Sequence, residues 1–412
     1  MRPRIVLAVA IVVHLGLGAA LATGGLRPFY NDIRNRPGPA ADFFAVYHAG
    51  RQVWTGRSPY ARAERPAITP SHFAPFRYPP GVAWTLGAAV AKTRPWIAYG
   101  AWLVIVEGLL VVGVIRLREL VDDPRRLAWL RAAWLAFPPF FLELWMGQFT
   151  FVAAMLTFFA VLAWRRGRAR RGAVAWAAAC VLKLFPLALV PALALRRRAG
   201  ALALMTIALA AALAPLLAID GGVRGFFALN FGAPEAAEVH AGNFSLLALL
   251  YEGVTWVTGA APDAAGWAVV ARVVAWSLAA LVAVAMWRGR RGDLGVAAAA
   301  ALWLLPLMSK DSWEHHAVVA LPAVALMAAA FAARPRHLAL TAAAWALVAL
   351  PSLLVALQRT PSTWYPDATW SPGVRVLYHA PHPLGALLGL GLCVAAMWRG
   401  DAAGARYDAP PQ

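Results

Sequence analysis

The chain has 412 residues, of which 61% are hydrophobic and 14% are charged. Its mean hydropathy is +0.62, and several apolar runs of about 20 residues are long enough to cross a bilayer, which excludes a soluble globular protein. The formal net charge of +19 would suggest a nucleic acid partner for a soluble domain. Here the basic residues form short clusters between apolar runs, as in cytoplasmic loops, so we expect a polytopic membrane protein without a nucleic acid partner.

The N-terminal run MRPRIVLAVAIVVHLGLGAALATGG fits two interpretations. Arg2 and Arg4 precede an apolar core that ends in small residues, which is the pattern of a secretory signal peptide. An uncleaved first transmembrane helix has the same features. Because many apolar segments follow in this chain, we favour the uncleaved helix.

Apolar segments and arginine clusters alternate along the chain. The clusters read RLRELVDDPRR, RRGRARR, RRR, RGRR and RPR, and placing them all on the cytoplasmic side with both termini gives about twelve crossings. This path requires the run 172–195 to break at its KLFP sequence and return as two short helices, which is tolerated where protein surrounds the break. It also requires 79–91 and 244–258 to lie at the outer surface. The candidate segments are 5–26, 95–116, 127–146, 149–164, 172–195, 199–219, 267–287, 294–307, 315–333, 337–357 and 384–398.

This path gathers polar residues that are costly in lipid on the extracytoplasmic side. They are the loop 27–94 with Asp42, Gln148 after Gly147, Lys183, the GNFS sequence at 242–245, the SKDSWEHH sequence at 309–316 and the loop 358–383. Such convergence predicts an outward-facing site between the helices, and therefore an enzyme or a transporter.

Several of these motifs follow one another in an order that resembles glycosyltransferase family 87. They are DFFAVYHAGRQVWTGRSPY, FRYPP, GQ after a proline-rich span, LKLFP, GNFS, and DSWEHH followed by LPA, so that the resemblance extends from Asp42 to about Pro322. The family's usual asparagine, glutamine, serine run reads NFS here. The resemblance implies a C-type glycosyltransferase that uses a polyprenyl-phosphate sugar, with a catalytic acid in the first outer loop; family members include mannosyltransferases and arabinofuranosyltransferases of actinobacterial envelope synthesis.

Asp42 is the candidate catalytic base. A lipid-phosphate sugar carries its own leaving group, so one base for the acceptor hydroxyl suffices, whereas glycoside hydrolysis needs two carboxylates. Asp42 opens the first outer loop, near the bilayer surface where a lipid-linked sugar is presented. Two alternatives stay open: Asp42 is the N-cap of an amphipathic helix, or Asp32 is the base.

The predicted phosphate end of the site contains Lys183, His315 and His316, for which snorkelling of the lysine and helix capping by the histidines are the structural alternatives. Adjacent histidines on a helix point about 100° apart, so both cannot easily bind one metal, and we expect no metal.

Cys180 and Cys393 lie inside apolar runs and indicate neither a disulfide framework nor a metal site. Lys310 beside Asp311 fits a surface ion pair.

The other predicted substrate-binding residues are Gln148, Asn243, Tyr78 and Trp313. Most of the 19 tryptophans should lie at the membrane interfaces. Aromatic residues within the motifs are candidates for stacking on sugar or for lining a lipid groove: Trp54, Tyr60, Tyr78 and Trp313.

We therefore predict an all-α polytopic membrane protein of C-type glycosyltransferase architecture, with one integral membrane domain over 1–398, an extracytoplasmic catalytic loop over 27–94 and a cytoplasmic tail over 399–412. The predicted activity is an inverting hexosyl transfer, of mannose, from a polyprenyl-phosphate donor to a membrane lipid or envelope glycan in the cell membrane. No cofactor is expected. The alternative is a lipid or solute transporter, although neither an internal repeat nor a nucleotide-binding motif supports it.

Overall fold

A computed structural model describes residues 2–34, 38–60, 76–219, 222–231, 242–309, 311–351, 354 and 370–400. Within these ranges the chain forms helices joined by turns, and none of them contains a β-strand, so the all-α prediction is confirmed. Lys310 and residues 401–412 of the predicted tail lie outside the described residues.

Six helical stretches in the described chain are long and apolar enough to cross a membrane. They coincide with predicted segments, because a run of about 20 apolar residues both favours a helix and matches the bilayer thickness. They contain α1 (Pro3–Ala22), α6 (Pro95–Arg116), α7 (Pro124–Leu135) with α8 (Pro138–Met146), α12 (Ala199–Leu213), α15 (Ala264–Arg288) and α20 (Pro381–Arg399).

The remaining helices are shorter, and many of them are also apolar. Because several predicted crossings correspond to helices of fewer than 18 residues, the count of twelve crossings stays a prediction. These helices are α2 (Asn31–Arg34), α3 (Ala41–Trp54), α4 (Pro80–Val82), α5 (Ala88–Val90), α9 (Thr150–Arg165), α10 (Ala169–Leu182), α11 (Val190–Leu195), α13 (Gly222–Phe231), α14 (Leu246–Thr258), α16 (Leu294–Met308), α17 (Ala320–Ala330), α18 (Pro335–Ala349) and α19 (Pro372–His379).

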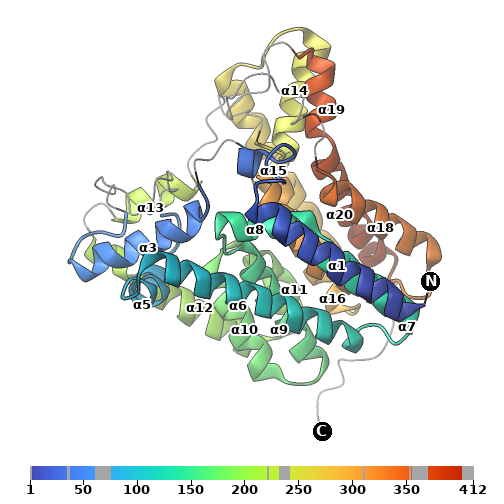
Figure 1. Cartoon of the computed structure of the whole chain (residues 1–412), viewed down its shortest axis with the longest axis horizontal. Coiled ribbons are helices and arrows are strands. Elements are labelled where there is room, and N and C mark those ends of the chain that lie inside the picture. Colours follow the sequence, from blue (N-terminus) through green and yellow to red (C-terminus); the bar gives the residue numbers. More distant parts are fainter. Residues whose placement is uncertain are drawn as a thin grey trace.

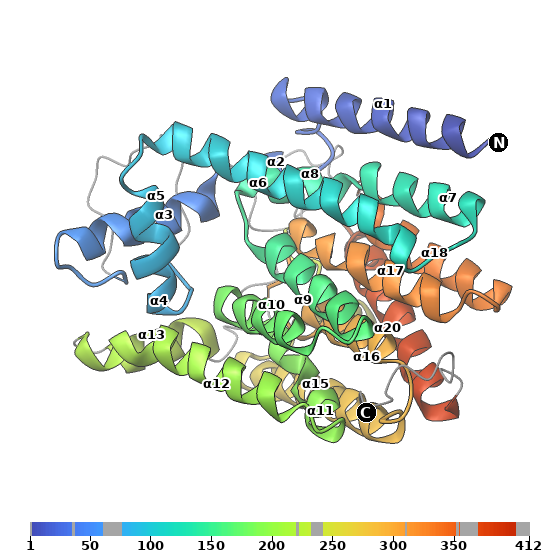
Figure 2. The same ribbon diagram turned by 90° about the horizontal axis from the view of Figure 1, so that it is seen from below.

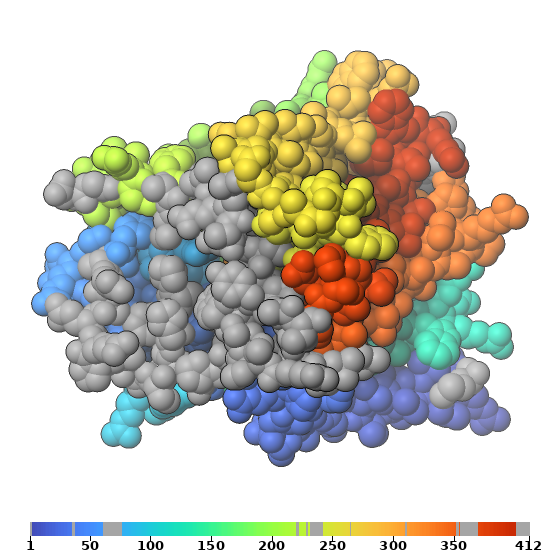
Figure 3. All heavy atoms as spheres, turned by 90° about the horizontal axis from the view of Figure 1, so that it is seen from above, coloured from blue at the N-terminus to red at the C-terminus, as the bar shows by residue number. Residues whose placement is uncertain are grey.

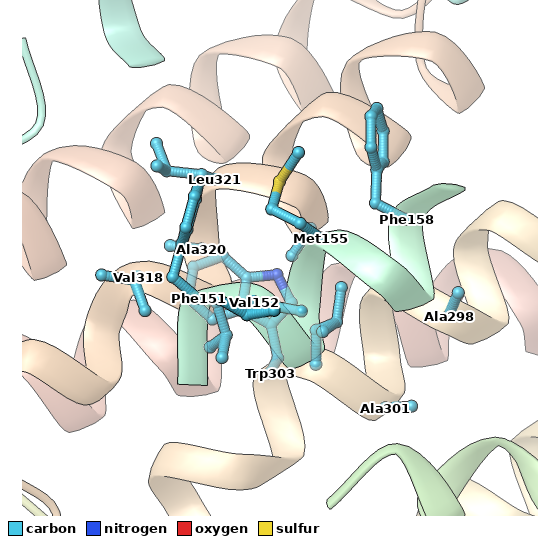
Figure 4. Close-up of a cluster of buried hydrophobic side chains, with 14 of the residues drawn as sticks. Phe151, Val152, Met155, Phe158, Ala298, Ala301, Trp303, Val318, Ala320 and Leu321 are labelled. Carbon is cyan, nitrogen blue, oxygen red and sulfur yellow. The ribbon is translucent and has the colours of Figure 1, made fainter. Parts of the chain in front are cut away.

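The centre of the molecule is the packing of α9, α16 and the start of α17. Figure 4 shows Phe151 and Met155 of α9 beside Trp303 of α16 and Leu321 of α17, and all four side chains are buried. In contrast, α1 and α15 leave large apolar side chains exposed, such as Val12 and Trp276, as expected for helices whose outer face meets lipid.

The run 172–195 breaks at Lys183, as predicted. Helix α10 ends at Leu182, Lys183 is extended, and a 3₁₀ segment (Phe185–Leu189) leads into α11. The arginine-rich turns at the start of α10 and after α11 line one cavity, so the chain turns back to the end of the molecule from which it came.

Contacts join the arginine clusters to one another. Arg165 pairs with Asp293, Arg166 lies 3.1 Å from Glu119, Arg196 donates to the carbonyl oxygens of Gly289 and Gly292, and Arg126 donates to that of Ala332. These bonds connect all five clusters, so they lie at a common end of the helices, as the predicted topology requires.

The loop after α1 folds over the ends of other helices. Figures 1 and 2 show α3, α5 and α13 together at one side of the molecule, away from the N-terminus. Helix α3 packs closely on a π-helical turn, Ala83–Gly87, between α4 and α5, because Gly50 meets Gly87 without side chains between them. This contact fixes the helix that carries Asp42.

Helices α14 and α19 form a projection near the start of α15 (Figure 1). Their spheres adjoin on the face shown in Figure 3, and Arg375 of α19 lies 3.0 Å from Glu252 of α14. Phe244, just before α14, packs against Tyr378 of α19 with ring centroids 5.2 Å apart. The projection thereby holds the GNFS sequence against the end of the helices.

Candidate active site

Asp42 lies in the first turn of α3 with its side chain half-buried. The N-cap of this helix is Ala40, whose backbone is left-handed with φ 68° and whose N–H donates to the carbonyl oxygen of Trp145 at 2.6 Å. The interpretation of Asp42 as the N-cap is therefore wrong, because the N-cap lies two residues earlier and is held by a backbone contact. Within the described chain, the Asp42 carboxylate forms neither a hydrogen bond nor an ion pair.

Gly147 allows the end of α8 to approach α3. Its φ is +61°, and a Cβ atom there would lie 2.6 Å from the Cβ of Phe43, next to Asp42. Glycine alone adopts this left-handed conformation readily and leaves this space. The neighbouring Gln148 is thereby brought to the same region as Asp42.

Gln148 and Tyr78 form a buried hydrogen-bonded pair. The Tyr78 hydroxyl donates to Gln148 Oε1 at 2.7 Å, and the same oxygen accepts the N–H of Phe149 at 2.9 Å. Burial raises the pKa of Tyr78 well above its usual value, so the phenol stays neutral and acts as a donor. Two predicted site residues are therefore in contact.

Lys183 lies at the break after α10 with its Nζ 5.3 Å from the centroid of the Tyr78 ring. It is close enough to Asp42 and Glu143 for electrostatic interaction. A lysine that snorkels would extend toward the lipid headgroups, whereas this one faces the predicted site. The break in the helix makes room for the side chain at that position.

Asp32 and His315, 283 residues apart, form a buried polar contact. One carboxylate oxygen of Asp32 accepts from both the backbone N–H and the Nδ1 of His315, each at 2.8 Å. The backbone N–H of Asp32 donates to Glu314 Oε2 at 3.1 Å. Since Asp32 is fully buried, an acceptor hydroxyl has no access to it, which disfavours Asp32 as the base.

His315 and His316 lie in a 3₁₀ segment, Glu314–Val319, called the histidine segment below, and they differ in exposure. His315 is buried and His316 is half-buried, with ring centroids 4.4 Å apart. His316 Nδ1 accepts the backbone N–H of Trp313 at 3.2 Å. Lys183 and Arg77 lie within electrostatic reach of His316, and Lys183 also lies within electrostatic reach of Asp42.

The side chain of Asn243 holds two backbone segments together. Its Oδ1 accepts the backbone N–H groups of Ser245 and Ser312 at 3.0 and 3.1 Å and so ties the GNFS sequence to the histidine segment. Trp313 packs on Gly242, where a Cβ atom would lie 2.3 Å from its ring, and donates its indole N–H to Asp311 at 3.0 Å. Contacts of Asn243 and Trp313 with substrate stay predictions.

Two residues that sequence reasoning did not single out belong to the region. Glu143 of α8 is 1% exposed, accepts the N–H of Phe151 at 2.6 Å and lies within electrostatic reach of Asp42, Lys183 and His315. Arg77 directly precedes Tyr78. A sequence signal existed for both, since Glu143 is the lone charge of an apolar run and Arg77 belongs to the quoted FRYPP sequence.

The described residues contain no group of three or more histidine, cysteine or acidic side chains arranged to hold a metal ion.

Comparison with protein families finds a match to the model of glycosyltransferase family 87 over residues 76–309, which is more than half of the chain. The match includes Tyr78, Gln148, Lys183 and Asn243, while Asp42 precedes it and the histidine segment follows it. No match is found among curated proteins.

Proposed function

Because the chain belongs to glycosyltransferase family 87, we propose that it transfers a hexose, mannose, from a polyprenyl-phosphate donor to a hydroxyl group of a membrane lipid or envelope glycan. The family makes the chain a glycosyltransferase, and its apolar helices make it a membrane protein. No family match of this kind favours a transporter.

The observation that carries the proposal is a half-buried carboxylate, Asp42, that has no hydrogen-bond partner among the described residues and lies within electrostatic reach of Lys183, which in turn lies within electrostatic reach of His316. Transfer from a sugar phosphate needs one proton acceptor near the acceptor hydroxyl and positive or donating groups near the departing phosphate. The three residues supply these two requirements from three separate segments of the chain.

In the proposed reaction the Asp42 carboxylate takes the proton of the acceptor hydroxyl as its oxygen attacks C1 of the sugar. The bond between C1 and the phosphate oxygen breaks on the opposite face, and its electron pair stays on the phosphate. The new glycosidic bond has inverted configuration at C1, and the proton rests on Asp42. Lys183 balances the charge that develops on the leaving phosphate, and His316 donates a hydrogen bond to it.

We further propose that the site faces the extracytoplasmic side. The arginine clusters gather at a common end of the helices, and such clusters favour the cytoplasmic side. Gln148 and Lys183 lie at the opposite ends of the same helices, since α9 runs from just after Gln148 to Arg165 and α10 runs from Ala169 to just before Lys183. The apolar runs that flank the site suit a donor held in the bilayer by its polyprenyl chain.

The test is transfer by the purified protein in lipid nanodiscs, supplied with a synthetic polyprenyl-phosphate mannose and a panel of lipid and glycan acceptors. We expect a mannosylated product and release of polyprenyl phosphate. Release of free mannose without product would indicate hydrolysis, and activity with a nucleotide sugar instead would contradict the proposed donor class.

A further inference from the structure

We propose that the adjacent histidines are fixed in opposite tautomers, with Asp32 as a positioning residue, so that neutral His316 presents its Nε2–H to the site. The role of that N–H, donation to the departing phosphate, rests on the proposed function. The tautomers themselves follow from the hydrogen bonds and are testable without any substrate.

The tautomer of His316 is set by the backbone. The N–H of Trp313 can only donate, so His316 Nδ1, 3.2 Å away, must accept with its lone pair. The proton of the neutral ring then lies on Nε2. Among the described residues Nε2 has no hydrogen-bond partner, and the side chain is half-buried, so this N–H is available to a ligand.

The same contact disfavours a doubly protonated His316. An imidazolium would turn the Nδ1 proton toward the Trp313 N–H, which places two donors against each other. Burial of the ring opposes the charged form, and the positive charges of Lys183 and Arg77 nearby oppose it further. His316 is therefore a neutral donor, and Lys183 supplies the charge.

The tautomer of His315 is the opposite one. A carboxylate oxygen of Asp32 accepts from Nδ1 at 2.8 Å, which places a proton on Nδ1. On the other side of the ring, Nε2 lies 3.4 Å from Gln148 Nε2. The amide of Gln148 cannot be reversed, because its oxygen already accepts the N–H of Phe149. Gln148 therefore donates to the ring, and His315 Nε2 accepts.

Asp32 acts on the site through His315. It is fully buried and is held by its own N–H bond to Glu314, so its carboxylate has a fixed position. It fixes both the backbone and the ring of His315, and the ring of His315 packs on that of His316 at an interplanar angle of 60°. Such outer hydrogen bonds orient a functional group without touching the substrate.

The decisive test is nitrogen NMR of the protein in nanodiscs, labelled with ¹⁵N at its nine histidines. His315→Gln and His316→Gln assign the two pairs of ring signals. We expect a protonated Nε2 and a bare Nδ1 for His316, and the reverse for His315, at neutral pH. A protonated Nδ1 on His316, alone or with Nε2, would overturn the inference whatever the activity of the protein.

A substitution of Asp32 tests its role as a positioning residue. Asp32→Asn can offer an N–H toward His315 Nδ1 in place of an acceptor, so we expect the single tautomer of His315 to give way to a mixture. Glu252→Gln, which neutralises another buried acid in the α14–α19 projection, serves as the matched control and should leave both histidine patterns unchanged. An unaltered His315 pattern in Asp32→Asn would remove Asp32 as a positioning residue.

Kinetics give a second readout. His316→Gln keeps an N–H donor and should retain more activity than His316→Ala, for which a loss of about 100-fold in kcat is expected from the removal of one donor. Asp32→Asn should lower kcat about tenfold with little change in the KM for the donor. Equal losses in the two His316 variants would contradict the assigned donor, even if transfer itself is confirmed.

Discussion

Asp32 and Asp42 lie ten residues apart, yet the fold gives them different surroundings. Asp32 is fully buried and bonded to His315, whereas Asp42 is half-buried at the start of α3 and has no hydrogen-bond partner among the described residues. Only the second environment leaves a carboxylate accessible to a substrate hydroxyl. These surroundings agree with the proposed roles of the two acids, Asp42 as the proton acceptor and Asp32 as a positioning group.

The first prediction concerns Asp42. Asp42→Asn keeps the size of the side chain and removes the proton acceptor, so we expect normal insertion and donor binding with a loss of transfer of about 100-fold or more. The measurement is the transfer rate at saturating donor in nanodiscs. Asp263→Asn is a matched control, because Asp263 caps α15 at an exposed site and asparagine caps a helix about as well.

Full activity of the Asp42→Asn protein, in a folded sample with verified donor, would refute the mechanism. A larger loss in Asp32→Asn than in Asp42→Asn would move the base to Asp32 and contradict the buried, bonded position of that carboxylate.

The second prediction concerns Lys183. Removing this cation leaves the departing phosphate with less stabilisation in a site of low dielectric, so Lys183→Ala should lower donor use by about 100-fold in kcat/KM, while Lys183→Arg should retain part of it. Lys92→Ala is the control, since Lys92 also lies over an aromatic ring, at 4.7 Å from Trp54, but on an exposed surface. Wild-type kinetics in Lys183→Ala would exclude this residue from the site.

At the scale of elements, the position of Asp42 depends on how closely α3 approaches the turn before α5. A Cβ atom on Gly50 would lie 2.1 Å from the carbonyl carbon of Gly87. Backbone atoms cannot move aside as the end of a flexible side chain can, so any side chain at this position must separate the two segments.

The third prediction follows from this contact. Gly50→Ala should destabilise the protein on the order of 1–3 kcal/mol and reduce transfer by displacing α3. Thermal unfolding in detergent and transfer assays measure the two effects. Gly100→Ala in α6 is the control, because a Cβ atom there meets no neighbour within 4 Å and the stability should be equal or higher. An unchanged melting temperature in Gly50→Ala would show that the segments are not tightly packed.

At the scale of the whole molecule, the helices have an arginine-rich end and an end that carries the candidate site. The ion pairs Arg165–Asp293 and Arg166–Glu119 join segments of the first end. The positive-inside rule assigns that end to the cytoplasm. The proposed extracytoplasmic orientation of the site rests on this assignment, because α9 and α10 connect the two ends.

The fourth prediction tests this orientation. A cysteine at Thr55, exposed after α3, or at Ser309, before the histidine segment, should react with a membrane-impermeant thiol reagent in intact cells with a permeable outer layer. A cysteine at Ala169, exposed in the arginine-rich turn, should react only after lysis. The native Cys180 and Cys393 are buried and should stay silent. Labelling of Thr55→Cys only after lysis would invert the proposed topology.

Much of the helical architecture could be predicted from the sequence. The predicted segment 95–116 coincides with α6, and the break at Lys183 was expected from the lysine, phenylalanine and proline within an apolar run. These features depend on hydropathy and on backbone preferences, which are properties of neighbouring residues. The alternative in which Asp42 is an N-cap was wrong for the complementary reason, since Ala40 begins α3 through a contact with Trp145 on another helix.

The sequence by itself therefore determined the membrane class, the helices, the common side of the arginine clusters and the resemblance to the family. Only the tertiary structure decided which acid is accessible, that Glu143 and Arg77 join the region, and which hydrogen-bond partners face the ring nitrogens of each histidine. The physical reason is the range of the interactions: apolar length and charge clustering act within one segment, whereas the Asp32–His315 bond joins residues 283 positions apart. Such a bond exists only once the helices have packed.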